Sequence, residues 1–160
     1  MTTSTGGEEL DQIFLLADTD PDAMKAMNAD LVAGFRASGG HLGGDFEGVP
    51  LLLLTTTGAR TGNRRTTPVL YTRDGGSYVV IASKSGAATH PDWYHNLRAN
   101  LRASIEVGGQ QRQVRARIAD GDERQRLFGQ HAAALPNYAA YQRRTSRRLP
   151  VIVLDTDGSC

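Results

Sequence analysis

Basic and hydroxyl side chains follow the apolar runs in the middle of the chain. An apolar run at 51–54 leads into an arginine-rich loop at 58–65, and another at 78–82 ends in Ser83 and Lys84. Glycines interrupt the chain beside both groups. Because guanidinium and ammonium groups bind phosphate and carboxylate groups, the pattern predicts an anion site at the ends of these runs.

The familiar signatures of catalytic residues are absent from the sequence. There is no Gly-x-Ser-x-Gly elbow, and Gly58 and Gly62 are not followed by the lysine of a nucleoside-triphosphate loop. His90 and His95 are five residues apart with no cysteine nearby, which argues against zinc. Since the chain shows no evident nucleophile or metal set, a bound cofactor would have to supply the difficult chemistry. The anion that we expect is therefore the phosphate of a redox coenzyme.

Strands are predicted to hold these side chains, because the spacing of apolar residues changes near Val49. Residues 74–76 predict a tight hairpin turn, and the glycines at 108–109 predict another. Pro68 lies within a strand pattern and cannot donate to a ladder, so it marks an edge strand or a bulge. The last strand is expected to be central. The predicted strands are 49–57, 65–73, 77–83, 104–107, 111–119 and 151–154.

Helices are predicted at the start, middle and end of the chain from apolar residues at helical spacing. Asp20 is the expected N-cap of the second helix, and Asp122 that of the fourth. Arg143 to Arg148 are most simply a solvated helix face. The predicted helices are 8–18, 21–38, 90–100, 122–135 and 138–148.

The order of elements indicates an α+β protein rather than a doubly wound parallel sheet. About six strands are mostly joined by hairpins, with no alternation of strand and helix. A small antiparallel barrel would leave no exposed edges. With 160 residues, we expect a single domain over 20–160, preceded by a flexible or short-helix segment at 1–19.

Composition excludes several classes of partner. The net charge is +1 and the arginine clusters are not interleaved with stacking aromatics, so nucleic-acid binding is not expected. No apolar run is long enough to span a bilayer, and no signal peptide is evident. The single cysteine, Cys160, favours a reducing cytoplasm. For residues 8–18, packing on the domain is favoured over peripheral membrane contact, since their polar face is acidic. Monomer and homodimer remain open.

Four motifs, in the same order and with similar gaps, resemble those of the deazaflavin-dependent nitroreductase family of actinobacteria. The resemblance extends from about residue 29 to about residue 155. Members use reduced coenzyme F420, a deazaflavin with a phosphodiester and an oligoglutamate tail. The motifs are residues 58–62, 65–69, 82–86 and 90–97.

The resemblance implies a split β-barrel of the flavin-reductase or FMN-binding type and a set of site residues. It implies catalytic roles for Ser83 near the reactive ring edge and for Tyr138, the better candidate proton donor. It implies a substrate pocket walled by Tyr138, Tyr141 and Leu135. The implied coenzyme-binding residues are Ala59, Arg60, Thr61, Arg65, Thr66, Thr67, Pro68, Val69, Ala82, Ser83, Lys84, Trp93, Tyr94 and Asn96.

Simpler interpretations remain beside these. Trp93 is also expected to plug the barrel as a core residue, and Tyr141 is equally explained by packing. Two residues depart from the family pattern: Ala59 replaces a basic residue of many relatives, and Leu135 replaces an aromatic of some nitro-activating ones. Coenzyme binding should then depend more on Arg60, and nitroimidazole activation is in doubt.

The function implied is hydride transfer from reduced F420 to an electron-poor acceptor. Candidate acceptors are quinones, enones of the coumarin or furan type, and activated nitro compounds. Two alternatives are an FMN-dependent reductase or oxidase of the same fold and a non-catalytic deazaflavin carrier. Cytoplasmic location is expected, with membrane association left open by residues 8–18.

Overall fold

The computed structural model describes residues 21–39, 50–82 and 90–156, without the side chains of residues 21–28 and Asn137. The predicted N-terminal segment 1–19, its helix at 8–18 and the Asp20 cap lie outside the described residues. The strands are β1 (Leu51–Thr57), β2 (Arg64–Leu70), β3 (Thr72–Asp74), β4 (Ser77–Ile81), β5 (Arg102–Val107), β6 (Gln110–Ile118) and β7 (Val151–Thr156). The helices are α2 (Pro21–Ala37), α3 (Asp92–Ala99), α4 (Gly121–Ala134) and α5 (Asn137–Arg144).

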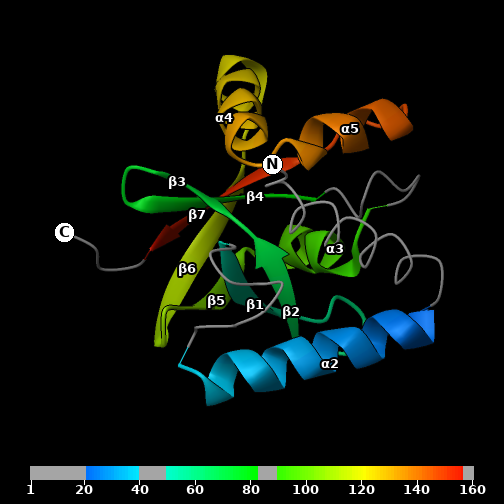
Figure 1. Ribbon diagram of the computed structural model, residues 1–160, viewed down its shortest axis with the longest axis vertical. Coiled ribbons are helices and arrows are strands. Elements are labelled where there is room, and N and C mark those ends of the chain that lie inside the picture. The colour runs from blue at the N-terminus through cyan, green and yellow to red at the C-terminus, as the bar shows by residue number, and fades with distance from the viewer. Residues whose placement is uncertain (1–20, 40–49, 83–89, 157–160) are drawn as a thin grey trace, which may run out of the picture.

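The described strands form one antiparallel sheet whose two edges are consecutive in the chain. The strand order is β2-β1-β5-β6-β7-β4-β3. At Tyr71 the chain leaves its pairing with β1, where Leu70 is opposite Leu51, and pairs with β4, where Thr72 is opposite Val79. One residue therefore joins the two edge strands, so the sheet must curl toward a barrel (Figure 1). The single strand predicted at 65–73 was wrong in this respect, because its pairing partner changes at Tyr71.

The strand predictions that depended on local turns are confirmed. Gly75 and Gly108 both have positive φ values, +60° and +56°, in the turns that join β3 to β4 and β5 to β6. Pro68 lies on the edge strand β2, as its missing N–H requires. The strand β7 lies between β6 and β4 and its first four residues are buried, so its central place is also confirmed.

The inner face of the sheet encloses a core that α3 completes. Leu52, Leu54 and Val80 from the strands pack in the same cluster as Trp93 and Leu97 from α3. Trp93 is 6% exposed. Burying the apolar face of α3 in this way stabilises the helix, which is too short to be stable alone. The expectation that Trp93 fills the barrel core is confirmed.

Helices cover two separate outer regions of the sheet (Figure 1). Phe35 on α2 packs against Leu51 and Leu53 of β1. Helices α4 and α5 cover the outer faces of β4 and β7 in a second cluster, which contains Leu127, Tyr138 and Tyr141 together with strand residues such as Val79 and Val153. The N-terminal and C-terminal helices therefore do not share a core.

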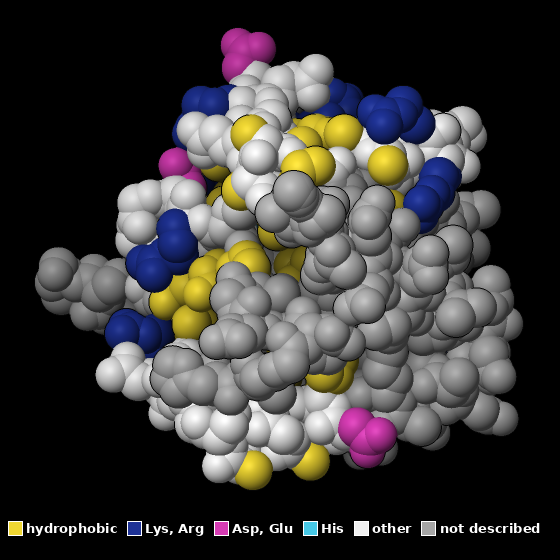
Figure 2. Space-filling view, in the orientation of Figure 1, with side chains coloured by type: hydrophobic (Ala, Val, Ile, Leu, Met, Phe, Trp, Pro, Cys, Tyr) yellow, Lys and Arg dark blue, Asp and Glu magenta, His cyan; other side chains and the backbone are white. Residues whose placement is uncertain are grey.

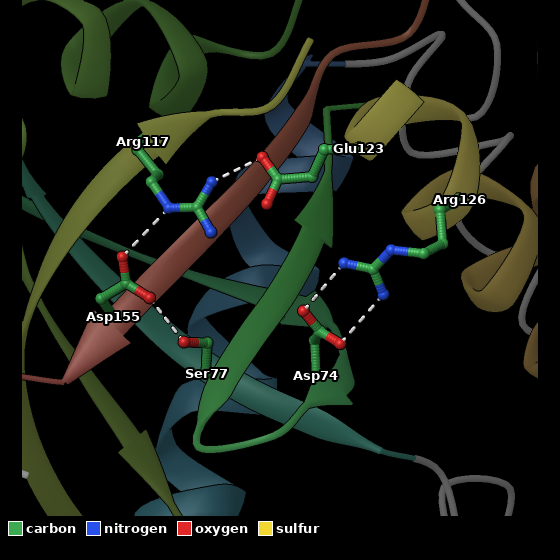
Figure 3. A network of polar contacts seen from close by, with 6 residues as sticks. All are labelled: Asp74, Ser77, Arg117, Glu123, Arg126 and Asp155. Atoms are coloured by element: carbon green, nitrogen blue, oxygen red, sulfur yellow. Dashed lines mark hydrogen bonds and ion pairs between the residues drawn. The ribbon is translucent and has the colours of Figure 1, made fainter. Parts of the chain in front are cut away.

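Ion pairs connect α4 to the interior strand β6 and to the edge strand β3 (Figure 3). Arg117 on β6 contacts Glu123 at 2.6 Å and Asp155 on β7 at 3.2 Å. Arg126 on α4 donates two hydrogen bonds to Asp74 at the end of β3. These pairs are largely exposed, so they contribute more to the orientation of α4 than to stability.

Three predicted helix boundaries were wrong. The N-cap of α4 is Asp120, and Asp122 lies in the first turn. Helix α3 begins at Asp92, after an extended Pro91, rather than at His90. Helix α5 ends at Arg144, so Arg147 and Arg148 are not on a helix face. The Gln142 side chain donates to Arg147 O and accepts from Leu149 N, which replaces the hydrogen bonds that a longer helix would have made.

None of the helices in the described residues is long and apolar enough to cross a membrane.

Candidate functional site

The loop between β1 and β2 is a compact turn that presents Arg60 and Thr61 at its exposed tip. Gly58 N donates to Asn63 O at 2.7 Å, and Gly62 N donates to Gly58 O at 2.9 Å. A Cβ at Gly58 would lie 2.9 Å from Thr61 Oγ1 and 3.1 Å from the backbone oxygen of Asn63, so a larger residue there would displace part of the loop. The Arg60 side chain is exposed, as an arginine must be to meet a ligand from solvent.

Helix α3 holds this loop through one buried amide. Asn96 Oδ1 accepts a hydrogen bond from Ala59 N at 2.9 Å, and Asn96 Nδ2 donates to Thr56 Oγ1 at 3.2 Å. Asn96 is 8% exposed. The structure thus shows what Asn96 does within the chain: it fixes the loop that carries Arg60. A contact between Asn96 and a coenzyme remains a prediction.

Strand β2 divides its predicted coenzyme residues between two faces of the sheet. Side chains alternate along a strand, so Arg65, Thr67 and Val69 share a face opposite the face of Thr66 and Pro68. The register assigns the first three to the inner face, since Thr67 pairs with Leu54 and Val69 with Leu52. A ligand on one face therefore meets the side chains of only one of these groups.

The outer face of β2 is already occupied by polar contacts within the sheet. The hydroxyls of Thr55 and Thr66 are 2.8 Å apart and share a hydrogen bond. Arg64 reaches across to Ser104 Oγ on β5 at 3.3 Å. These contacts fix Thr66 and Arg64, whereas Arg65 is exposed near the loop tip.

Arg147 brings together the residue that follows β4 and the segment that precedes α3. Its Nη1 donates to Ala82 O at 3.1 Å and lies 2.9 Å from His90 Nδ1. Ala82 is fully buried and its N–H donates to Pro150 O at 3.0 Å. Ser83 and Lys84 follow Ala82 directly in the chain but lie outside the described residues.

His90 is suited to accept that hydrogen bond. Burial, followed by the positive charges of Arg147, His95 and Arg98, lowers the pKa of His90. A neutral imidazole has one unprotonated nitrogen, which here is Nδ1 facing Arg147. The His90 ring also packs on Tyr94 of α3, with 4.7 Å between ring centroids. Arg147 and Tyr94, distant in sequence, are thereby connected.

Tyr138 and Tyr141 lie in the core under α4 and α5. The Tyr138 ring makes edge-to-face contacts with His131 at 4.4 Å and with Tyr141 at 5.2 Å between centroids. Both tyrosines are buried, and the half-buried Leu135 packs against the same cluster. Whether they wall a substrate pocket remains a prediction.

His131 is a fully buried polar residue of α4 that was not among the predicted site residues. Its Nδ1 lies 2.9 Å from Thr72 Oγ1, and within the described residues its Nε2 has no hydrogen-bond partner. Burial lowers the pKa of His131 to about 4, so the ring is neutral at pH 7. Its spacing to Tyr138 crosses Pro136, where the helical period is broken, so no sequence signal linked the two rings.

Two further surface features lie apart from these residues. A cavity of about 620 Å³ lies between the β3 region and α4, and none of the predicted site residues lines it. Basic side chains lie over α5 (Figure 2), where Arg143 and Arg144 are exposed, as expected for a solvated helix face. Among the described residues, no three His, Cys, Asp or Glu side chains gather as a metal site would need.

Helix α3 is thus the element around which several of the coenzyme candidates assemble, whereas Tyr138, Tyr141 and Leu135 lie in the separate cluster under α4 and α5. Asn96 faces the β1–β2 loop, while Tyr94 lies beside His90, which joins it to Arg147 and Ala82. The arrangement places an exposed arginine loop and the end of β4 on one rigid support.

The chain is similar in sequence to known proteins. The family model described as F420H(2)-dependent quinone reductase matches residues 29–156. An F420H(2)-dependent quinone reductase of Mycobacterium tuberculosis (strain H37Rv) is 41% identical over 124 residues, covering 75% of this chain and 83% of that protein. A second from Mycobacterium tuberculosis is 39% identical over 106 residues, covering 66% of this chain and 89% of that protein.

Solved structures support the same grouping. The structure of an F420-H2 dependent reductase is 37% identical, with a TM-score of 0.62, and covers 66% of this chain and 94% of that one. A structure described as a domain-swapped dimer is also 37% identical, with a TM-score of 0.62, over 66% of this chain and 80% of that one. The haem storage protein HutZ of Vibrio cholerae, at 12% identity and a TM-score of 0.54 over 70% of this chain and 84% of that one, shares the fold alone. The predicted α+β split β-barrel is confirmed.

Proposed function

The chain belongs to the F420H(2)-dependent quinone reductase family, and from this premise we propose that it is an enzyme that reduces quinone-type acceptors with reduced coenzyme F420. The single observation that carries the proposal is the family match over residues 29–156, which includes the arginine loop, α3 and the end of β4. When bound, reduced F420 supplies a hydride. A quinone that receives this hydride also takes up a proton and becomes a hydroquinone.

Coenzyme binding is assigned to the loop tip and the inner face of β2. Arg60 and Arg65 are exposed and provide positive charge for a phosphodiester or a carboxylate tail. The inner-face residues Thr67 and Val69 belong to the same stretch as Arg65. Asn96 contributes by keeping the loop in place, so little conformational entropy is lost when the ligand binds.

The proton is assigned to Tyr138, with Ser83 as the second candidate. Reduction of one quinone carbonyl leaves an oxygen that must be protonated, and a positioned phenol is a suitable general acid. The contact with the neutral ring of His131 fixes the orientation of Tyr138. Supplying the proton in a site closed to water would favour the hydride transfer step.

The range of acceptors beyond quinones belongs to the same proposal. Enones of the coumarin or furan type share the electron-poor carbon that a hydride attacks. Leu135 is half-buried beside Tyr138 and lacks the ring that some nitro-activating relatives are expected to have there. We therefore place quinones and enones ahead of nitro compounds.

The proposal includes a cytoplasmic location and a monomer or homodimer as the working unit. A relative at 37% identity is described as a domain-swapped dimer, which makes a dimer worth testing by light scattering. Peripheral membrane contact by residues 8–18 is tested by co-sedimentation with anionic vesicles.

A titration followed by a turnover assay tests the function. We expect the purified protein to quench or shift the fluorescence of F420 on binding and to bind FMN weakly. We then expect oxidation of reduced F420 in the presence of menadione. Tight binding of FMN without binding of F420 would contradict the coenzyme assignment. Binding of F420 without turnover across a panel of quinones and enones would favour a carrier.

A further inference from the structure

We propose that Arg147 is a positioning residue of the coenzyme site, because one of its guanidinium nitrogens holds Ala82, which follows β4, to His90, which precedes α3. The inference rests on the proposed function, since it concerns the site for the same coenzyme. The sequence pattern had placed Arg147 on a solvated helix face, yet it lies beyond the end of α5 and is half-buried.

The contacts of Arg147 reach both of the described elements that flank this part of the predicted site. Nη1 lies 3.1 Å from Ala82 O and 2.9 Å from His90 Nδ1. Both atoms face the same nitrogen, so the positions of Ala82 and His90 depend on one another. A hydrogen bond from a charged donor is about twice as strong as a neutral one, which makes this connection stiff.

The connection continues from His90 to a residue predicted to meet the coenzyme. The rings of His90 and Tyr94 pack with 4.7 Å between centroids. Arg147 therefore sets the position of Ala82 relative to Tyr94, and both belong to the predicted coenzyme set.

The segment that carries Arg147 is itself held in place, so the guanidinium is supported from behind. Gln142 Nε2 donates to Arg147 O at 2.8 Å, and Arg147 N donates to Thr145 Oγ1 at 3.2 Å. Leu149 N donates to Gln142 Oε1 at 3.0 Å, and Leu149 is fully buried. The backbone at residue 147 is thus fixed by α5 and by the core, as a positioning residue requires.

The charge state of His90 fits this role. An imidazole that accepts from Arg147 must be unprotonated at Nδ1, and burial lowers the pKa of His90 in agreement. Arg98 lies over the Tyr94 ring, with 5.9 Å from its Cζ to the centroid, and His95 packs against His90 at 5.7 Å. Arg147, Arg98 and His95 are the charged or titratable groups that raise the cost of protonating His90, with Tyr94 beside them.

A set of variants separates positioning from charge. Arg147→Gln removes the positive charge and the planar set of N–H donors, whereas Arg147→Lys keeps the positive charge. His90→Leu removes the hydrogen-bond acceptor without changing the charge at neutral pH. Arg143→Gln, on the exposed face of α5, is the matched control for loss of one positive charge. His90→Asn keeps an acceptor close to the Nδ1 position and tests for rescue.

The measurements are the dissociation constant for F420 by fluorescence, KM and kcat with menadione, and the melting temperature. We expect Arg147→Gln and His90→Leu each to weaken F420 binding about tenfold, as loss of a charge-assisted hydrogen bond should. The double variant should be no weaker than Arg147→Gln alone, because both changes break one connection. His90→Asn and Arg143→Gln should bind F420 as the wild type does.

Other results would contradict the proposed function, the role of Arg147, or both. If the wild type binds no F420, the proposed function fails and this inference fails with it. If the wild type binds and both Arg147→Gln and His90→Leu bind equally well, only the inference fails. If Arg147→Gln weakens binding but Arg147→Lys and His90→Leu do not, then Arg147 acts through charge and positions nothing. If every variant that binds F420 more weakly also has a lower melting temperature, and His90→Asn restores neither, then Arg147 has a purely structural role.

Discussion

Asn96 on α3 and Ala59 at the tip of the β1–β2 loop are joined by a hydrogen bond of 2.9 Å, in which the amide oxygen of Asn96 accepts from the backbone N–H of Ala59. The same amide donates to Thr56 at the end of β1. One buried side chain thus sets the angle at which the arginine loop leaves the sheet, and α3 acts as the support of the candidate site.

The first prediction concerns this amide. Replacing Asn96 by Leu should lower the free energy of unfolding by about 2 kcal/mol, because the Ala59 N–H and Thr56 hydroxyl lose their partner. Asn96→Asp should cost less, since a carboxylate still accepts from the Ala59 N–H and, in place of the donated bond, can accept from the Thr56 hydroxyl. Urea unfolding measures the difference, and F420 affinity should fall together with stability in Asn96→Leu. Equal stability of the wild type and Asn96→Leu would show that the amide does not hold the loop.

The second prediction concerns the exposed loop. Arg60→Ala should weaken F420 binding about tenfold and reduce its dependence on salt, because one ion pair with an anionic ligand is lost. Arg112→Ala changes an exposed arginine on β6 that donates to Gln110 Oε1, and it serves as the matched control. Titrations at low and high salt measure both slopes. Lys84→Ala is expected to behave like Arg60→Ala. Unchanged affinity in both Arg60→Ala and Lys84→Ala would contradict the assignment of the anionic part of the coenzyme to these basic residues.

The third prediction concerns the proton donor. Tyr138→Phe should lower kcat about 100-fold while leaving the dissociation constant for F420 unchanged, because a general acid acts in the transition state. Tyr141→Phe is a control in the same cluster, with its ring 5.2 Å from that of Tyr138. Stopped-flow oxidation of reduced F420 by menadione measures the step. A full rate in Tyr138→Phe would transfer the role to Ser83, which Ser83→Ala tests.

The fourth prediction concerns the effect of pH on stability. The pKa of His131 is about 4 in the folded protein, below its ordinary value of 6.5. The unfolded chain therefore binds a proton below about pH 6.5 that the folded protein does not, so stability is complete above pH 6.5 and falls as the pH approaches 4. The loss due to His131 should reach about 3 kcal/mol across this window.

The control for that prediction is a comparison between variants. His131→Leu should lose this part of the pH dependence in urea unfolding between pH 7 and pH 4. If stability falls with pH in the same way in the wild type and in His131→Leu, then His131 takes up its proton at the same pH in the folded and the unfolded chain.

Features that depend on a few neighbouring residues were predicted well. The β3–β4 and β5–β6 turns followed from glycines that adopt positive φ, and β7 was predicted to be central from four consecutive apolar residues. The edge position of Pro68 followed from its missing N–H. In each case the conformation of a few neighbouring residues, or the burial of one strand, is enough to decide the structure.

Features that depend on a distant partner were not predicted. The cap of α4 was assigned to Asp122, although Asp120 occupies that position. Thr66 and Thr67 were assigned to one ligand surface, but pairing with β1 separates them between two faces. Arg147 was assigned to a helix that ends three residues earlier, because Gln142 and Thr145 provide other partners for the backbone.

The sequence by itself therefore determined most of the strands, the two hairpin turns and the basic character of the loop, since side-chain alternation, glycine conformations and charge are properties of short stretches. The tertiary structure alone decided which of these residues meet. The change of partner at Tyr71 curls the sheet, and that curl allows α3 to hold the arginine loop through Asn96 and to lie beside Arg147 through His90. These contacts join residues that are 37 and 57 positions apart, so they depend on how the whole core packs, which no short stretch of sequence specifies.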